Sequence, residues 1–163
     1  MTRTSAAPIV ASLVSSAWLG AALFFSAVVA PAAFRALPDA SMAGALVRAT
    51  LPAVFYAGIV AGIVSLWLGL GASVSARRVR TACAVGVALC CAVAQFGAVQ
   101  RIERLRARLT TPIESLAPSD PLRITFGRLH ALSVGLLGLA MILAAVTVVL
   151  SWRAGLASSV SPE

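Results

Sequence analysis

The sequence predicts an all-α integral membrane protein, a bundle of four transmembrane helices with a short amphipathic helix in its third loop. Three observations predict this fold. Hydrophobic residues make up 60% of the 163 positions and charged residues only 11%, whereas a soluble domain is about a quarter charged. The mean hydropathy is +0.98. Four continuous apolar runs are long enough to cross a bilayer, and none shows the period-two alternation of a barrel strand.

The four runs cover residues 9–33, 51–73, 81–99 and 124–150, and we expect them to form one transmembrane domain over residues 1–163. A spanning helix needs about 20 apolar residues, and the third run only just reaches that length. Proline in the first turn after a small polar residue is typical of a helix start. Thr50 before Leu51-Pro52 therefore predicts the start of the second helix, and Ser119-Asp120-Pro121 predicts the start of the fourth.

The third loop contains two further helix signals. Thr111-Pro112-Ile113-Glu114 has the pattern of a capping box and predicts a short helix. Residues 100–109 are amphipathic: one face carries Ile102, Leu105 and Leu109, and the neighbouring face carries Arg101, Arg104 and Arg108. This segment is suited to binding anionic lipid headgroups at the membrane surface. The alternative is a solvated extension of the third helix.

Small residues at four-residue spacing predict close helix packing, because burial alone does not drive helices together in lipid and small residues let their backbones approach. The second helix has Gly58-xxx-Gly62 with Ala61-xxx-Ser65 beside it, and the first helix has Ser16-xxx-Gly20. The fourth helix has Gly135 and Gly138. These patterns favour a compact bundle, and they leave a homo-oligomer open.

The net charge of +8 comes from 13 arginines. Most of them lie in short clusters between apolar runs, without the interleaved aromatic residues of a nucleic-acid groove, so we expect no nucleic-acid partner. With four helices, the two termini share one side with the second loop. That side carries Arg3, Arg77, Arg78, Arg80 and Arg153; the other carries Arg35, Arg48, Arg101, Arg104, Arg106, Arg108, Arg123 and Arg128. The positive-inside rule then predicts that both termini lie outside, in a bacterial inner membrane.

His130, the only histidine in the chain, and Arg128 lie near the start of the fourth run. A histidine can bind haem or a metal, or move protons. We interpret this one first as an interfacial hydrogen-bonding group, and Arg128 as a side chain that reaches the headgroups. The sharper hypothesis is a polar cluster, in which an acidic residue of the third loop, Glu103, Glu114 or Asp120, folds back toward the helix.

The remaining polar groups do not form a catalytic pattern. Cys83, Cys90 and Cys91 lack metal-ligand spacing, and we expect them to pack as small hydrophobic side chains. Gln95 and Tyr56 lie well inside the runs, where an interhelical hydrogen bond is favoured over a cavity-lining role. No hydrolytic triad or phosphate loop is present. We therefore expect no catalytic residue, no metal site and no cofactor, with His130 as the one cofactor-binding candidate.

Taken in order, the chain resembles the transmembrane protein 205-like family of small four-helix membrane proteins, whose bacterial members are mostly catalogued as a domain of unknown function. The resemblance covers residues 10–150 and depends on three segments: AWLGAALFFSAVVAPAAF (17–34), RALPDASMAGALVRATLPAVFY (35–56) and FGRLHALS (126–133). Family members often have glycine after the histidine, where this chain has Ala131. The resemblance implies a four-helix fold and draws attention to Trp18, Gly20, Pro31, Phe34, Pro52, Phe126, Arg128 and His130.

The resemblance supplies no reaction, although the family's association with drug resistance implies transport or membrane adaptation. The leading hypothesis is a non-enzymatic membrane protein with a role in transport, in drug or metal resistance, or as a membrane scaffold. The alternative is a haem-binding or redox membrane enzyme that uses His130, for which a second copy of the chain would have to supply the second ligand.

Overall fold

The computed structural model describes residues 7–69 and 74–159, and these residues form helices and short connections without any strand. The helices are α1 (Ala7–Phe24), η1 (Phe25–Val29), α2 (Ala30–Ala36), α3 (Ala40–Gly69), α4 (Val74–Ala92), η2 (Val93–Val99), α5 (Gln100–Arg106), η3 (Ile113–Ser115) and α6 (Pro121–Ser159). Four continuous helical segments are long and apolar enough to cross a membrane: Ile9–Ala36, Ala40–Leu68, Arg78–Arg106 and Pro121–Arg153. The predicted fold class is confirmed, and the chain is a multi-pass membrane protein.

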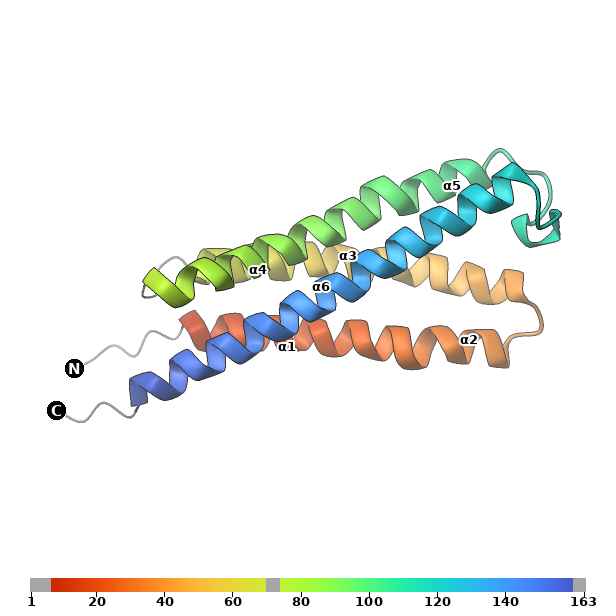
Figure 1. Ribbon diagram of the computed structural model, residues 1–163. Helices are drawn as coiled ribbons and strands as arrows, with labels where there is room; N and C mark the ends of the chain where they lie inside the picture. The colour runs from red at the N-terminus through yellow and green to blue at the C-terminus, as the bar shows by residue number, and fades with distance from the viewer. Residues whose placement is uncertain (1–6, 70–73, 160–163) are drawn as a thin grey trace.

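The four long helices run side by side, each antiparallel to the next along the chain (Figure 1). The start of α1 and the end of α6 lie at the end where α3 is followed by α4, which we call the terminal end. The connection 37–39 and the loop 107–120 lie at the opposite end, which we call the loop end. There α5 and the start of α6 diverge from α2 (Figure 1). A segment such as Arg78–Arg106, at 1.5 Å per residue, is ~43 Å long, so its ends extend beyond a hydrocarbon core of about 30 Å.

Two of the long helices contain a π-helical stretch. In the first, the amide of Ala30 bonds to the carbonyl of Phe25, five residues back. This shift comes just before Pro31, which has no N–H for the ordinary bond and would otherwise clash with the preceding turn. In the third, the amide of Gln100 bonds to the carbonyl of Gln95. Each π-helical stretch lies where its helix approaches the loop end.

The second helix begins at Ala40, so the predicted start at residue 51 is wrong. Pro52 lies inside α3, which is tolerated in membrane helices because neighbouring groups can satisfy the freed backbone carbonyl. The start is set by Asp39, whose carboxylate accepts hydrogen bonds from the Ser41 hydroxyl at 2.7 Å and from the Met42 amide at 2.8 Å. The Ser41 hydroxyl and then the Met42 amide hold the pKa of the Asp39 carboxyl below its usual value.

The helix starts predicted for the third loop are confirmed only in part. Asp120 caps α6 as expected, because its carboxylate accepts a hydrogen bond from the Leu122 amide at 2.7 Å and Pro121 is the first helical residue. The Thr111–Glu114 pattern yields only the single 3₁₀ turn η3, which starts at Ile113. The amphipathic segment is helical over residues 100–106 and continues the third span without a break. It therefore takes the form of an extension of the third helix.

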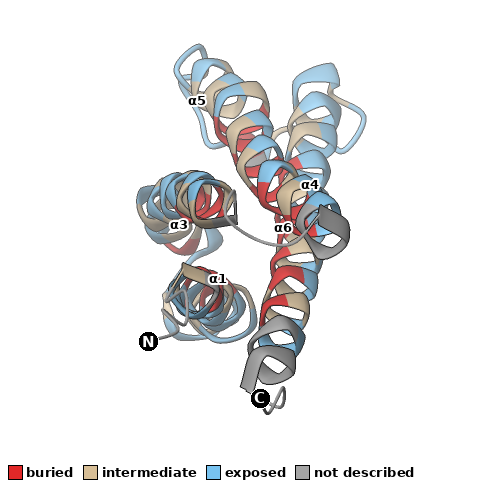
Figure 2. Cartoon of the chain, turned by 90° about the vertical axis from the view of Figure 1, so that its left-hand side faces the viewer, coloured by how far each residue is buried: buried red, intermediate tan, exposed pale blue. Residues whose placement is uncertain are grey.

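The core lies where α1, α3, α4 and α6 turn their buried faces toward one another (Figure 2). Gly62 is the glycine that comes closest to the backbone of another helix, since a methyl group on it would lie 2.7 Å from the Ala84 carbonyl oxygen and 2.8 Å from the Ala88 nitrogen. The prediction of close packing is wrong for Gly20, Gly135 and Gly138, which have nothing within 4 Å of that position. Four-residue spacing does not indicate which face meets a neighbour, and the first helix packs through Trp18 and Ala22 instead.

Candidate functional site

A cavity of about 310 Å³ opens at the loop end, where four helical segments diverge. Its walls come from α2, α3, the end of η2, α5 and the start of α6. Most of its lining is apolar, and the charged and aromatic groups are few. The lining residues are Phe34, Ala40, Gly44, Val47, Arg48, Leu51, Val99, Ile102, Glu103, Arg106, Phe126, His130 and Ser133.

The polar groups of this cavity come from three helices. Arg48 of α3 and Glu103 of α5 form an ion pair, with 3.9 Å between Nε and Oε1, and both side chains are 44% exposed. The guanidinium carbon of Arg106 lies 5.0 Å from the centre of the Phe126 ring, close enough for a cation–π interaction. Phe126 in turn stacks on His130, with ring centres 5.9 Å apart and planes inclined by 16°.

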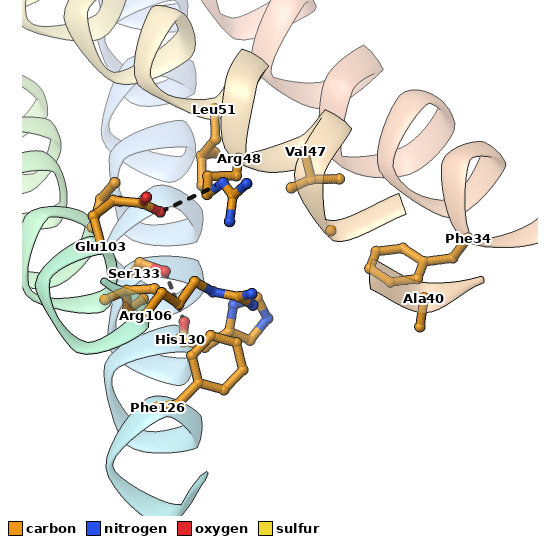
Figure 3. Close-up of a pocket in the computed structure, with 13 residues that line it drawn as sticks. Phe34, Ala40, Val47, Arg48, Leu51, Glu103, Arg106, Phe126, His130 and Ser133 are labelled. Atoms are coloured by element: carbon orange, nitrogen blue, oxygen red, sulfur yellow. Dashed lines mark hydrogen bonds and ion pairs between the residues drawn. The ribbon is translucent and has the colours of Figure 1, made fainter. Parts of the chain in front are cut away.

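Figure 3 shows how these side chains face one space: Phe34 approaches from α2, and Arg106, Phe126 and His130 lie across from it. Phe126 and His130 are one helical turn apart on α6, so they share a face of that helix. Phe34 belongs to α2, the last part of the first span, which follows the π-helical stretch η1.

A second cavity, of about 480 Å³, adjoins the first and shares Arg48, Val99 and Glu103 with it. Gln95 lines this second cavity and is 5% exposed, and its Oε1 atom is buried with no hydrogen-bond partner among the described residues. The expectation that Gln95 makes an interhelical hydrogen bond is therefore wrong. Pro52 lines the same cavity and has no N–H to offer the carbonyl of Arg48, four residues earlier.

The structure brings together three of the eight residues that the family resemblance singles out: Phe34, Phe126 and His130 line the first cavity. Pro52 belongs to the second. The other four lie apart from both cavities. Trp18 is buried in the core, where its indole N–H donates to the Val54 carbonyl at 2.9 Å. Gly20, Pro31 and Arg128 are exposed.

The described side chains do not form the polar cluster that was the sharper hypothesis: Arg128 has no ion pair among them, and Glu103 pairs with Arg48 of α3 instead. The Glu114 side chain lies outside the described part of the structure. Glu103 still shares a cavity with His130. The three cysteines are buried free thiols. Among the residues that the structure describes, no group of three histidine, cysteine, aspartate or glutamate side chains could hold a metal ion.

Sequence reasoning did not single out Arg48 and Arg106 as cavity residues. The sequence shows both only as positive charges that bear on membrane orientation. Arg48 could have been found, because it stands four residues before Pro52, at the position whose carbonyl a helix proline leaves without its usual partner. Arg106 could also have been found, because it lies one helical turn after Ile102 and away from the face that Arg104 and Arg108 share.

A family model described as a domain of unknown function, DUF4149, matches residues 13–110, which is more than half of the chain. The match includes Phe34, Arg48, Glu103 and Arg106 and ends before α6. No curated protein matches the chain, and no solved structure matches it either.

Proposed function

We propose that this chain, which belongs to the DUF4149 family, binds a small anionic amphiphile in the loop-end cavity. It does so as a non-enzymatic membrane protein with a role in transport or in resistance to membrane-active compounds. The observation that carries the proposal is the lining of the cavity. Apolar walls would hold a hydrocarbon or aromatic body, and guanidinium groups at one side would hold an acidic head.

The charges around the cavity favour an anion. Among the residues that line the cavity, Arg48 and Arg106 supply two guanidinium groups and Glu103 one carboxylate, and His130 adds a hydrogen-bonding group. A guanidinium matches the geometry of a carboxylate or phosphate and can bind it through two parallel hydrogen bonds. The volume is at the lower end of the range for small-molecule sites, which is about 300–1,000 Å³. A single short chain or ring system fits this size better than a complete phospholipid.

The placement in the membrane is part of the same proposal. The loop end faces the cytoplasm of a bacterium, both termini face outward, and the exposed Arg101, Arg104 and Arg108 contact anionic headgroups of the inner membrane. The arginine distribution supports this orientation. The resemblance to the transmembrane protein 205-like family supports a role in resistance, and a homo-oligomer or a scaffold role remains compatible with it.

The proposal can be tested with a photoreactive analogue of decanoic acid that carries a diazirine on its chain. The full-length protein is placed in phosphatidylcholine nanodiscs, irradiated with the probe, and digested to map the labelled residues. We expect labelling to concentrate on cavity-lining residues such as Val47, Ile102 and Phe126. Arg48→Gln and Arg106→Gln should each lower the yield several-fold, because each removes a charge-assisted hydrogen bond to the head.

Two controls sharpen this experiment. Gly44 lines the cavity and has open space beside it, so Gly44→Leu should fill the cavity and lower the yield without unfolding the protein. Arg153→Gln, at the exposed far end of α6, should leave the yield unchanged. Labelling spread evenly over lipid-facing residues such as Trp67 and Ile142, or equal yields with the matching decanol probe, would count against an anion-binding cavity.

The redox alternative has one observation in its favour, which is that His130 lines the cavity. A visible absorption spectrum of protein purified from its native host tests it. A Soret band that disappears in His130→Ala would establish haem ligation and replace the proposal above.

A further inference from the structure

Arg80 lies near the start of the third span, at the terminal end, far along the bundle from the loop-end cavity. It is only 4% exposed, and its Nε atom is buried without a hydrogen-bond partner among the described residues. Arginine stays protonated in proteins, so this is a permanent positive charge inside a helix bundle. Burying a charge without a counter-charge is strongly unfavourable.

No acidic side chain that the structure describes is available to balance this charge. Asp39, Glu103 and Asp120 all belong to the loop end, in the first connection, α5 and the third loop. The neighbouring Arg78 is exposed and can reach water or headgroups. Arg80 is almost fully buried, so its side chain has little access to water.

The helix register places two buried hydroxyl groups at the level of Arg80. One layer further into the bundle, Ser15 and Ser65 share a hydrogen bond of 3.0 Å, and they line a small void of about 10 Å³ together with Ala84 and Thr147. One helical turn from that layer toward the terminal end leads from Ser15 to Ser12, from Ala84 to Arg80, and from Thr147 to Ser151.

Both of these serines are buried and lack partners. Ser12 is 5% exposed and Ser151 is 2% exposed, and neither Oγ has a hydrogen-bond partner in the described part of the chain. A serine hydroxyl rotates freely and can donate to an acceptor. The same level of the bundle therefore carries one buried cation and two unused O–H donors, contributed by α1, α4 and α6.

We propose that Arg80, Ser12 and Ser151 bind a small monovalent inorganic anion of about the size of chloride. The guanidinium supplies the charge and charge-assisted N–H donors, and the two hydroxyls supply further donors. The exposed Arg78 and Arg153 at the same end make the local potential more positive and attract anions. The burial of all three side chains, at 5% exposed or less, favours a small ion over an oxyanion such as sulfate.

The test is a chloride titration of the full-length protein in a non-ionic detergent, with sodium gluconate replaced by sodium chloride at constant ionic strength. We expect the midpoint of thermal unfolding to rise with chloride and to saturate. Arg80→Met should abolish the rise and should unfold in gluconate at or above the wild-type midpoint, because methionine removes the unpaired charge and keeps much of the side-chain length. Arg78→Met, the matched exposed control, should keep the wild-type response.

The serine variants test the same site without removing its charge. Ser12→Ala and Ser151→Ala should each weaken the apparent chloride affinity several-fold, and they decide the matter if Arg80→Met does not fold. A wild-type midpoint that is independent of chloride would overturn the proposal. So would an equal rise with sulfate, or an unchanged chloride affinity in the double serine variant.

Discussion

Gly62 and Gly44 lie on the same helix, α3, and their surroundings differ. A methyl group on Gly62 would lie within 2.9 Å of three atoms of α4, two of them backbone. A methyl group on Gly44 would meet nothing within 4 Å, because this glycine lines the loop-end cavity. The terminal half of the bundle is thus held by direct backbone approach, and the loop end keeps open volume lined by charged and aromatic groups.

The difference shows how one bundle can combine closely packed helices with an open cavity. Close approach of helix backbones maximises dispersion contacts, which are the main attraction between helices in lipid. The terminal half uses it where Gly62 meets the backbone of α4, and Gly58 leaves room for the side chains of Trp18 and Cys91. At the loop end the helices are connected by longer side chains, such as the Arg48–Glu103 pair, and these can rearrange around a ligand.

The largest effect should come from Gly62→Ala. The added methyl group overlaps backbone atoms that cannot move aside, so we expect a loss of about 1–3 kcal/mol of unfolding free energy. Gly44→Ala, on the same helix, should leave stability unchanged or raise it by up to about 1 kcal/mol through helix propensity. Thermal or denaturant unfolding of both variants in the same detergent measures the difference.

Gly62→Ala and Gly44→Ala are matched controls, because each adds one methyl group to the same helix. Equal stabilities would show that the terminal half is no more tightly packed than the loop end. A large loss in Gly44→Ala would show that the loop-end cavity is closed in the membrane.

A smaller effect is expected for the coupling between Ser15 and Ser65, whose hydrogen bond joins α1 to α3 in the terminal half. Each single alanine variant leaves one buried hydroxyl without a partner and so includes a desolvation cost that the coupling energy excludes. The coupling energy between the two positions should be about 0.6 kcal/mol, the typical value for such bonds in membrane proteins. A double-mutant cycle of unfolding free energies measures it, and a coupling of zero would remove this bond from the account of the packed half.

Much of the fold could be predicted from the sequence, because apolar length and charge alone define spanning helices. The limits of those helices were harder to predict. Pro52 predicts a helix start, because proline favours the first turn. The helix in fact begins at Ala40, twelve residues before Pro52, where Asp39 caps it. A local signal at a helix end and the same signal inside a span look alike until the partner groups are known.

The site was predictable only in part, for a related reason. Phe126 and His130 share a helix face, so their association follows from spacing. Their meeting with Phe34, Arg48 and Arg106 depends on how far four helices diverge at the loop end, which no single segment encodes. The same holds for Arg80, whose burial depends on the rotation of α4 against α1 and α6.

The smallest effect should come from Asp39, at the exposed start of α3 on the loop end. Its pKa is lowered in the folded state by the Ser41 hydroxyl and then by the Met42 amide. Its contribution to stability is therefore present above the pKa of the unfolded chain, about 3.9, and is lost as the pH falls through the lower folded-state value. Asp39→Asn should remove this part of the acid dependence of the unfolding midpoint.

Ser41→Ala refines this last comparison, since it removes the strongest contributor to the shift and leaves the Met42 hydrogen bond in place. Its acid-induced fall in stability should be smaller than in the wild type and should end at a higher pH, because the folded-state pKa of Asp39 moves closer to that of the unfolded chain. The curve should lie between those of the wild type and Asp39→Asn. Superimposable curves for the three proteins would mean that the negative charge of Asp39 adds nothing to its cap, because asparagine can cap a helix through the same side-chain acceptor.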